Sequence, residues 1–507
     1  MTLQELIASL DRVLSEGDLQ REVVSVTEDS RQVKPGSVFV AIKGEHYDGH
    51  QFVRQAQKQG AVGVVVEDEG FEVSDPPGGK SSSALIRVKN SRKALGLLAA
   101  KLSGMPSVHL QMVGVTGTNG KTTVTHLAKS LLEAQGHRVG LLGTVGYMFG
   151  TEHRVASHTT PAPVELQDML NAMVRAGMDV AVMEVSSHAL ALDRVAGCEF
   201  DIVVFTNLTQ DHLDFHHTLD DYFQAKLRLF TECVDSGQKT RPKRALVNAD
   251  DERAALILQH CSIPTWTYGL HAQADIRAET VRLSLGGTEF LVNSPHGRLT
   301  INSQLVGEHN VSNMLAAIGI GLEMGMTVSM IEQAVHSVAN VPGRFERIDE
   351  GQPFTVVVDY AHTEDALYRL LRTAQAITQG RIITLFGCGG DRDAGKRPKM
   401  GQVAARHSDL VFVTSDNPRT ENPQSILAQI EQGIQSLLPE ERCPYQIIPD
   451  RAEAIYAAVA EAKDGDLLLI AGKGHEDYQI LGTQKIHFDD REETRKAIHR
   501  QMGSRSS

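Results

Sequence analysis

Short runs of aliphatic and β-branched residues alternate with helix-like segments along almost the whole chain. Runs such as VFVAI (38–42), LQMVGVT (110–116) and DLLLIAG (466–472) are typical of buried strands, and segment 121–136 places apolar residues at helical spacing. This alternation predicts α/β layers around parallel sheets. The chain has 507 residues, whereas a single hydrophobic core rarely grows past about 250–300 residues. We therefore expect several α/β domains.

Two breaks in the pattern suggest where these domains meet. The stretch SGMPS (103–107) precedes a strand that leads into a glycine-rich turn, and NVPGR (340–344) precedes a fresh series of strands. We therefore predict three domains, over residues 1–105, 106–341 and 342–507.

Composition and charge argue against several classes of protein. The formal net charge is −13, which argues against nucleic acid or an anionic membrane as the main partner. The five cysteines lie far apart, which argues against a disulfide framework or a structural zinc site and favours a reducing compartment. No apolar run reaches the roughly 18–20 residues that span a bilayer. We expect a soluble cytoplasmic protein, and the net charge still allows an anionic small ligand in a local positive pocket.

The run VGVTGTNGKTT (113–123) follows a strand and opens a helix. Its glycines let the backbone approach a phosphate, amides at the helix start face the anion, Lys121 adds a charge and a threonine hydroxyl can reach Mg²⁺. The strict motif has glycine where this chain has Val115. A glycine-rich turn with a solvated lysine is the alternative, which the strand–loop–helix context disfavours. The candidate ATP-binding residues here are Gly117, Thr118, Asn119, Gly120, Lys121, Thr122 and Thr123.

Polar residues also gather after two later strands. Glu184 ends the strand before SSHAL, where it can hold Mg²⁺ or cap the next helix, and the residues alone leave both readings open. The segment NLTQDHLDFH (207–216) carries two Asp and two His within six residues, which can be a site or helix caps. The helical pattern YFQAKLRLF (222–230) holds Lys226, and this pattern by itself indicates a solvent-exposed lysine.

GTNGKTT, together with these segments, resembles the Mur ligase family, the ATP-dependent enzymes that build the stem peptide of peptidoglycan; folylpolyglutamate synthases share the superfamily. The resemblance implies an N-terminal α/β uridine-nucleotide-binding domain, a central P-loop-type ATPase domain with a mostly parallel sheet, and a C-terminal Rossmann-like domain. It also implies that Lys226 is carbamylated by CO₂, since a desolvated lysine near another cation has a depressed pKa. The implied catalytic residues are Lys121, Glu184, His212 and Lys226, and the implied metal ligands are Thr122, Glu184, His212 and carbamylated Lys226.

Three later segments resemble the segments that surround ATP in members of this family. They are GEHNVSNMLAA (307–317), VPGRFE (341–346) and VVVDYAHTEDAL (356–367), the last with Glu364 where the family usually has proline. The resemblance implies that His309 and Asn310 lie near the base, that Arg344 reaches the γ-phosphate and that Asp359 binds the ribose. For Arg344, an ordinary interdomain salt bridge is the alternative.

The segment SDNPR (415–419) resembles the signature of family members that add meso-diaminopimelate. Diaminopimelate has a second carboxylate that lysine lacks, and the guanidinium of Arg419 can bind it through two parallel hydrogen bonds. An Asn-Pro turn with an exposed arginine is the alternative. Segments AGKGHEDYQ (471–479) and GCGGDRD (387–393) resemble the rest of this pocket. The implied diaminopimelate-binding residues are Arg392, Asp416, Asn417, Pro418, Arg419, Gly472 and Glu476.

Other segments resemble the family's binding sites for uridine and the muramoyl peptide. They are EDSRQVKPGSVFVA (28–41), GEHYDGH (44–50) and SHTTPAP (157–163), while Leu192 stands where a glutamine is expected. The implied residues are Ser30, Glu45, His46, Tyr47, His158, Thr159, Thr160, Ser186 and Arg194.

Together these resemblances imply an ADP-forming amide ligase. It would join meso-diaminopimelate to the D-Glu of UDP-N-acetylmuramoyl-L-Ala-D-Glu through an acyl phosphate, with ATP, Mg²⁺ and the Lys226 carbamate, as a cytoplasmic monomer. A lysine-adding relative is the first alternative, which DNPR disfavours, and the uridine-like segments disfavour a folate-polyglutamylating enzyme. A catalytically inactive nucleotide-binding scaffold is a third alternative, which the intact Lys121, Glu184, His212 and Lys226 disfavour.

Overall fold

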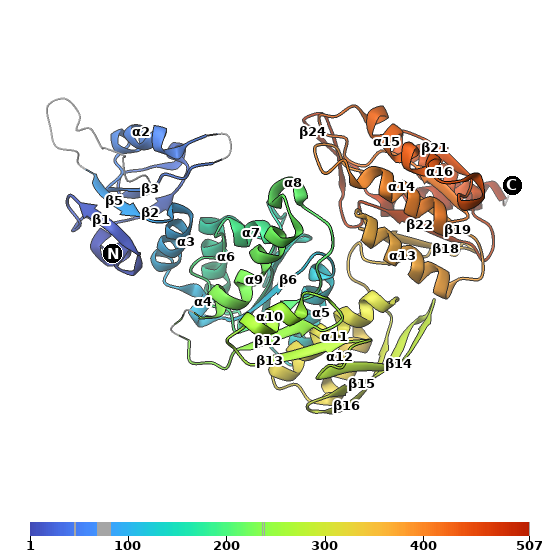
Figure 1. Cartoon of the computed structure of the whole chain (residues 1–507), viewed down its shortest axis with the longest axis horizontal. Coiled ribbons are helices and arrows are strands. Elements are labelled where there is room, and N and C mark those ends of the chain that lie inside the picture. The colour runs from blue at the N-terminus through green and yellow to red at the C-terminus, as the bar shows by residue number, and fades with distance from the viewer. Residues whose placement is uncertain (45–46, 68–82, 236, 238, 506–507) are drawn as a thin grey trace.

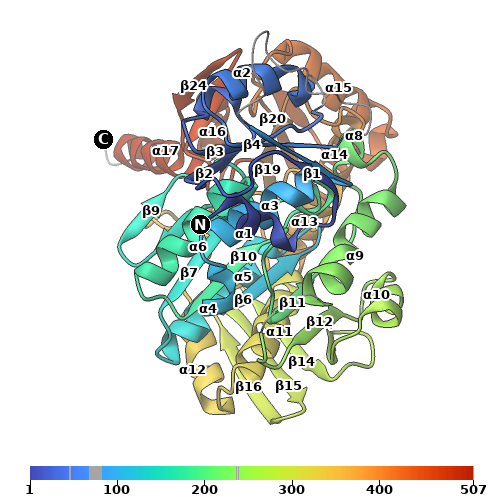
Figure 2. The same cartoon turned by 90° about the vertical axis from the view of Figure 1, so that its left-hand side faces the viewer.

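The computed structural model describes residues 1–44, 47–67, 83–235, 237 and 239–505. Three sheets follow one another along the chain, and each is covered by helices (Figure 1). Seen from the N-terminal end, the first sheet lies in front of the other two (Figure 2). No helix of the described residues is both long and apolar enough to cross a bilayer.

The first sheet has five strands in the order β1-β5-β4-β3-β2, and every pair is parallel except β1 with β5. Helices α1 and α3 pack on one face and α2 on the other. Strands β3 and β4 are buried along their whole length because both faces are covered. The bounds are α1 Leu3–Leu6, β1 Arg12–Glu16, β2 Ser25–Thr27, β3 Ser37–Val40, α2 Val53–Lys58, β4 Gly63–Val66, β5 Ala84–Val88 and α3 Ser91–Leu102.

The central sheet has eleven strands in the order β16-β15-β14-β13-β12-β11-β6-β10-β7-β8-β9. The strands from β14 to β7 are parallel, and antiparallel hairpins extend both edges. Its strands are β6 Gln111–Thr116, β7 Val139–Gly143, β8 Gly146–Phe149, β9 Glu152–Arg154, β10 Val180–Glu184, β11 Ile202–Phe205, β12 Arg244–Asn248, β13 Thr265–Gly269, β14 Ile276–Ser284, β15 Gly287–Ser294 and β16 Gly297–Ser303.

Helices α5, α11 and α12 cover one face of this sheet, and α6, α9 and α10 cover the other. Strand β6 lies in the middle, and the chain continues from it to strands on both sides. In parallel sheets, ligands bind outside the carboxyl ends of the strands at such a switch point. The helices are α4 Pro106–His109, α5 Lys121–Ala134, α6 Pro163–Arg175, α7 Ser187–Ala191, α8 Leu213–His216, α9 Leu219–Asp235, α10 Ala254–His260, α11 Glu308–Glu323 and α12 Val328–Ser337.

The third sheet has six strands in the order β17-β18-β22-β19-β20-β21, parallel except for β17. Helices α13, α14 and α15 pack on one face, and α16 and α17 on the other. A separate hairpin, β23–β24, follows β22. The bounds are β17 Glu346–Ile348, β18 Thr355–Asp359, α13 Glu364–Ile377, β19 Ile382–Phe386, α14 Lys396–His407, β20 Leu410–Val413, α15 Pro423–Gln435, β21 Tyr445–Ile447, α16 Arg451–Glu461, β22 Leu467–Ala471, β23 Tyr478–Leu481, β24 Gln484–His487 and α17 Asp490–Arg505.

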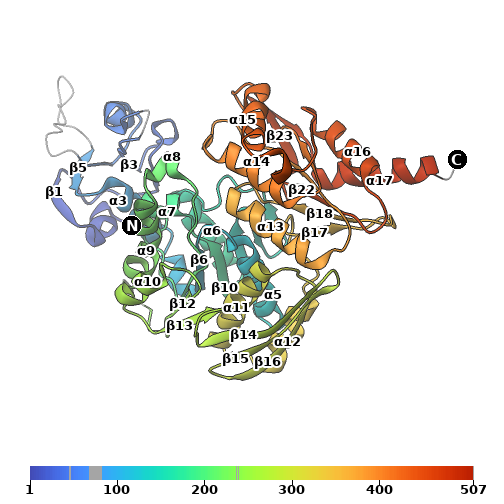
Figure 3. The ribbon, with the colours of Figure 1, turned by 45° about the vertical axis from the view of Figure 1, so that its right-hand side comes forward.

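The predicted fold class, α/β with mostly parallel sheets, is confirmed. The runs predicted as strands at 38–42, 110–116 and 466–472 are β3, β6 and β22, each within two residues of its predicted bounds at either end. Each of the three sheets, together with the helices that cover it, is called a unit below. Figure 3 shows α13 of the third unit on the side that faces the central unit, above α5 and α11. Gly120, in the loop after β6, and Asp359, at the end of β18, line one pocket, so the carboxyl ends of these two strands lie close to one another.

Candidate active site

The loop between β6 and α5 is shaped by two glycines. Gly117 and Gly120 both have a positive φ, of 147° and 88°. A Cβ at Gly117 would overlap the hydroxyl of Thr206, and one at Gly120 would overlap the side-chain oxygen of Asn313. No side chain caps α5, so its first N–H groups remain available to an anion. Gly117, Thr118, Asn119 and Gly120 form this loop, and Lys121, Thr122 and Thr123 form the first turn of α5.

Lys226 of α9 lies beneath this loop. Its residue surface is only 1% exposed, so the surface position predicted from the helical pattern is wrong. The helical pattern counts lysine as polar and so places it on the exposed face. Lys226 instead lies on the buried face of α9 with Tyr222, whose ring centre is 4.3 Å from the Lys226 Nζ. Burial, followed by the nearby charge of Lys121, holds the pKa of Lys226 well below its usual value. Burial and the neighbouring charge of Lys121 therefore favour the neutral amine of Lys226 over its ammonium form.

Glu184, at the end of β10, is buried beside the phosphate loop. Its Oε1 accepts hydrogen bonds from the Thr122 hydroxyl at 3.0 Å and from the Thr144 N–H at 2.9 Å. Its Oε2 accepts from the Thr144 hydroxyl at 3.1 Å. The strand end therefore presents hard oxygen atoms, the donor type that Mg²⁺ prefers.

His212 comes from the loop after β11, with its backbone in the left-handed region at φ 55°. Its ring lies 4.7 Å from the ring of His188. Burial, reinforced by the charges of Lys121 and Lys226, lowers the pKa of His212 to about 4 and outweighs the opposing charge of Asp211. The imidazole is therefore neutral near pH 7, as a metal ligand must be.

The expected magnesium ligands fit this site in their chemistry. Among the described residues, no group of three or more His, Cys, Asp or Glu side chains is placed to hold a metal ion. The expected set includes only two such side chains, Glu184 and His212. Its other oxygens would come from Thr122, which already contacts Glu184, and from a carbamate on Lys226.

A pocket of about 970 Å³, open to solvent, lies between the central and third units. The Asp359 carboxylate at the end of β18 accepts from the N–H groups of Phe345 and Ala361, at 2.7 and 2.8 Å. Of the expected ATP-binding residues, the pocket is lined by Asn119, Gly120, Thr123, His309, Asn310, Arg344 and Asp359.

Arg344 links the two units at this pocket. Its Nη2 donates to the Thr122 hydroxyl at 3.1 Å, and its guanidinium lies 4.6 Å from the ring centre of Tyr360. The Arg344 Nε is buried and has no hydrogen-bond partner among the residues that the structure describes. Arg344 forms no ion pair with another described residue. The structure therefore places this guanidinium against the phosphate loop and does not support the salt-bridge alternative.

A larger cleft of about 2200 Å³ runs beside the nucleotide pocket. Residues expected to bind the muramoyl peptide line it from the central unit, and residues expected to bind diaminopimelate line it from the third unit. The first group comprises His158, Thr159, Ser186 and Arg194, with His212 nearby, and the second comprises Arg392, Asp416, Asn417, Arg419, Gly472 and Glu476.

Other expected residues lie outside the cleft lining. Thr160 is buried behind Ser186 and donates to the Glu184 carbonyl at 2.8 Å. Pro418 shapes its turn, since its carbonyl oxygen accepts from the Glu421 N–H at 3.1 Å. The N-terminal unit carries buried Ser30 and Tyr47, which is 75% exposed, and Glu45 and His46 lie outside the described residues.

Arg419 is held at the cleft wall. Its backbone is left-handed, with φ 51°, and its Nη1 donates to the Gly390 carbonyl at 2.7 Å. Asn417 donates to Glu476 at 2.9 Å. The DNPR turn and the loop after β22 therefore meet, and Arg419 is not the free surface arginine of the alternative interpretation.

The sequence analysis missed Lys473 in the same region. Its side chain is fully buried, and its Nζ lies 3.2 Å from Glu476 Oε2, 3.4 Å from Asn417 Oδ1 and 3.7 Å from Asp416 Oδ1. Lys473 lies between two glycines in AGKGHE, and a lysine in a glycine-rich turn is typical of solvent-exposed surface. Its only sequence signal is that it lies within a segment already assigned to the acceptor pocket.

Comparisons with known proteins agree across the chain. Residues 22–102 match the model of the Mur ligase family catalytic domain, residues 115–321 that of the Mur ligase middle domain and residues 343–474 that of the Mur ligase glutamate ligase domain. A UDP-N-acetylmuramoyl-L-alanyl-D-glutamate–2,6-diaminopimelate ligase of Thermosynechococcus vestitus is 46% identical, over 99% of each chain. The enzyme of the same name from Geobacter sulfurreducens is 44% identical, over 97% of this chain and 98% of its own.

Solved structures agree as well. A structure described as a UDP-N-acetylmuramoyl-L-alanyl-D-glutamate–2,6-diaminopimelate ligase has a TM-score of 0.70 at 33% identity, over 99% of each chain. A MurF ligase from Thermotoga maritima in complex with ADP has a TM-score of 0.60 at 18% identity, over 97% of this chain and 100% of its own.

Proposed function

The chain belongs to the Mur ligase family, and we propose that it joins meso-diaminopimelate to the D-Glu of UDP-N-acetylmuramoyl-L-Ala-D-Glu, forming ADP and phosphate. The observation that carries this proposal is the large cleft, where candidate donor-binding and acceptor-binding residues face one another beside the phosphate loop. The names of the similar full-length proteins support the same reaction.

In the first step, the γ-carboxylate of the D-Glu residue attacks the γ-phosphate of ATP, giving an acyl phosphate and ADP. Lys121 and Arg344 offset the charge that gathers on the transferring phosphoryl group. Both approach the phosphate loop, Lys121 from α5 and Arg344 from the third unit. Thr122, Glu184 and His212 would hold Mg²⁺, which when bound reduces the repulsion between the carboxylate and the triphosphate.

We also propose that Lys226 carries a carbamate. The ammonium would first lose one proton, and the neutral amine would then form a C–N bond to CO₂ and release a second proton, which leaves an anion with two oxygens. Support comes from its burial, its lowered pKa and its closeness to Lys121. An anion there would relieve the repulsion between the two lysines and supply oxygen ligands beside Glu184.

In the second step, an amine of diaminopimelate attacks the carbonyl carbon of the acyl phosphate, and phosphate leaves. Arg419 would bind the distal carboxylate, while Asn417 and Glu476 would hold the amino end. This clamp favours diaminopimelate over lysine, which has no second carboxylate. Closure of the third unit over the cleft would keep water from the acyl phosphate.

The remaining expectations fit this scheme. We propose domains at 1–105, 106–341 and 342–507, with the uridine nucleotide bound by the first through Ser30 and the 45–47 segment. The protein would act as a monomer, because candidate residues for both substrates of one chain line one cleft. It would act in the cytoplasm, consistent with five free cysteines.

The proposal is tested by identifying the product. Purified protein is incubated with ATP, Mg²⁺, UDP-N-acetylmuramoyl-L-Ala-D-Glu and meso-diaminopimelate, and the nucleotide fraction is analysed by mass spectrometry. We expect the donor to gain the mass of diaminopimelate less one water, with one ADP formed per product. ADP formation without this product would contradict the proposal.

A further inference from the structure

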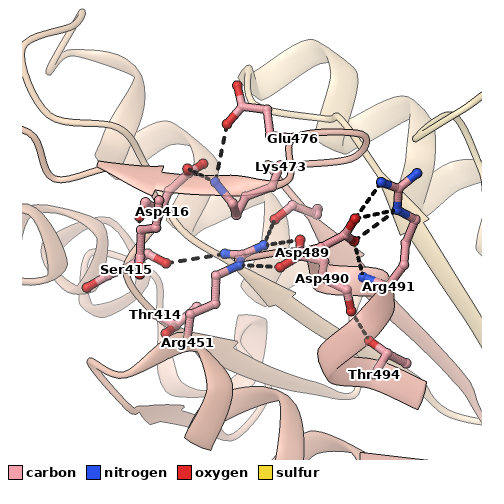
Figure 4. A network of polar contacts seen from close by, with 12 residues as sticks. Thr414, Ser415, Asp416, Arg451, Lys473, Glu476, Asp489, Asp490, Arg491 and Thr494 are labelled. Atoms are coloured by element: carbon pink, nitrogen blue, oxygen red, sulfur yellow. Dashed lines mark hydrogen bonds and ion pairs between the residues drawn. The ribbon is translucent and has the colours of Figure 1, made fainter. Parts of the chain in front are cut away.

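Arg451 and Asp490 form a fully buried ion pair beneath the acceptor side of the cleft (Figure 4). Both side chains are 0% exposed, and Arg451 Nε and Nη2 reach the two carboxylate oxygens of Asp490 at 2.7 Å each. Arg451 is the first residue of α16 and Asp490 the first of α17. Neither residue lines the cleft, so neither is a candidate for direct substrate contact.

Burial of such a pair is costly, because both ions lose their hydration. A well-packed apolar pair of similar volume is often as stable or more stable. The ion pair is therefore weak evidence for stabilisation of the fold. Burial alone would lower the pKa of Arg451, but the charges of Asp490, Asp416 and Glu476 outweigh it and raise the pKa, so the guanidinium stays charged.

The remaining donors of Arg451 reach two backbone carbonyls. Nη2 donates to Ala471 O at 3.0 Å and Nη1 to Ser415 O at 3.4 Å. Ser415 immediately precedes Asp416, and Ala471 immediately precedes Gly472. One guanidinium therefore contacts the bases of two of the loops that line the acceptor side of the cleft.

The strands that lead into these two loops are not neighbours in the sheet. Ser415 follows β20 and Ala471 ends β22, and β19 lies between these two strands in the sheet. The sheet ladder therefore does not connect the bases of the two loops directly. Further along, the Arg419 N–H donates to the Ile480 carbonyl at 3.1 Å and the Gly482 N–H to the Arg419 carbonyl at 2.9 Å, which ties the tip of the first loop to β23 after the second loop. Arg451 spans the gap between the loop bases, and Asp490 holds the guanidinium in the required orientation.

The spacing of the loops matters for the side chains above them. Asn417 from one loop donates to Glu476 from the other at 2.9 Å, and Lys473 approaches Glu476 at 3.2 Å and Asp416 at 3.7 Å. A shift of one loop relative to the other would break the contacts of Asn417 with Glu476 and of Lys473 with Asp416, whereas Lys473 and Glu476 belong to the same loop. The same shift would also move Arg419, which follows Asp416 by three residues.

We propose that Arg451 and Asp490 are positioning residues for the acceptor amino acid, because they fix the spacing between the 415–419 and 471–476 loops. This inference rests on the proposed function insofar as it assumes that these loops bind the acceptor. It assigns a role in substrate selection to two residues that do not touch the substrate.

The test compares Michaelis constants for the three substrates in the double variant Arg451→Met/Asp490→Leu. This variant removes both charges together, so no unpaired ion remains buried and the fold should persist. We expect the KM for diaminopimelate to rise about 10- to 100-fold, since small misplacements in a site cost up to about 10²-fold. The KM values for ATP and for the UDP-linked donor should stay within about twofold of wild type.

A matched control is Arg381→Met, which breaks another Arg–Asp pair of the same sheet. Arg381 precedes β19 and pairs at 2.7 Å with Asp466, which precedes β22, at the opposite ends of the strands. Its loss should change the melting temperature without moving the KM for diaminopimelate. If the double variant does not fold, Arg451→Lys replaces it: one ammonium can pair with Asp490 but cannot reach both carbonyls, so the acceptor KM should still rise.

The outcomes separate the two proposals. A folded variant whose acceptor KM stays within twofold of wild type would overturn the inference and leave the proposed function intact. Equal rises in all three KM values would also overturn it, because they would indicate general loosening. Wild-type protein that is inactive with diaminopimelate would overturn the proposed function, and this inference with it.

Discussion

The side-chain nitrogens of Lys121 and Lys226 both donate to the carbonyl oxygen of Gly117, at 2.9 and 2.8 Å. Two ammonium groups that share one acceptor in a buried site repel each other strongly. Loss of a proton from Lys226, or conversion of its amine to an anion, removes this repulsion. The shared contact of Lys121 and Lys226 with Gly117 therefore gives a physical reason for a carbamate on Lys226 beneath the phosphate loop.

Activity should depend on dissolved CO₂. In buffer depleted of CO₂, we expect the wild-type rate to fall and bicarbonate to restore it, because the carbamate would dissociate from Lys226. Lys226→Arg keeps a positive charge but cannot form a carbamate, so its rate should be lower by roughly 10²-fold or more and should not respond to bicarbonate. A wild-type rate that is equal in depleted and supplemented buffer would contradict the carbamate.

Stability should rise with pH through the titration of Lys226. The folded pKa lies below the usual value near 10.4, so between these two pKa values the unfolded chain binds more protons and the folded state gains stability as pH increases. In CO₂-free buffer, Lys226→Met should reduce this slope by up to about 1.4 kcal/mol per pH unit. Urea unfolding between pH 7 and 10 measures the slope.

The control for this experiment is Lys89→Met, because the Lys89 side chain is 72% exposed. Its slope should match that of the wild type. An equal slope in wild type and Lys226→Met would mean that Lys226 does not titrate abnormally.

Gly117→Ala should abolish tight ATP binding. The added Cβ would overlap the Thr206 hydroxyl, and the loop must then move away from the phosphates. We expect the affinity for ATP to fall at least about tenfold, and up to about 10²-fold for a shift near 1 Å. Gly136→Ala is a suitable control because its φ is also positive, at 99°, but its Cβ would meet no atom within 4 Å. Calorimetric titration that gives equal affinities for both variants would contradict the steric argument.

Arg344→Met should weaken the binding of nucleotides that carry a γ-phosphate and leave the binding of ADP unchanged. Arg344 contacts Thr122 at the first turn of α5 and carries a buried Nε without a partner among the described residues. We expect the rate to fall by about 10²- to 10³-fold, with weaker binding of a non-hydrolysable ATP analogue and unchanged binding of ADP. Equal losses for both nucleotides would place Arg344 elsewhere on the nucleotide.

The sequence analysis predicted features made of contiguous residues better than features made of residues that lie far apart in the chain. The phosphate loop was recognised because its residues are contiguous and its glycines are required by the backbone. Lys226 was placed wrongly from the pattern alone, because a helical pattern counts lysine as polar and does not reveal that this side chain packs beneath the phosphate loop. Arg451 and Lys473 were missed for a related reason, since their burial depends on strands and loops far apart in the chain.

The most direct test of the central claim measures phosphate release with ATP, Mg²⁺ and UDP-N-acetylmuramoyl-L-Ala-D-Glu, comparing meso-diaminopimelate with L-lysine in wild type and Arg419→Ala. We predict turnover that requires diaminopimelate and falls by about 10²-fold or more in the variant, because the second carboxylate loses its bidentate partner. Equal use of lysine by the wild-type protein would contradict the assigned acceptor, and no turnover with either amino acid would contradict the ligase reaction itself.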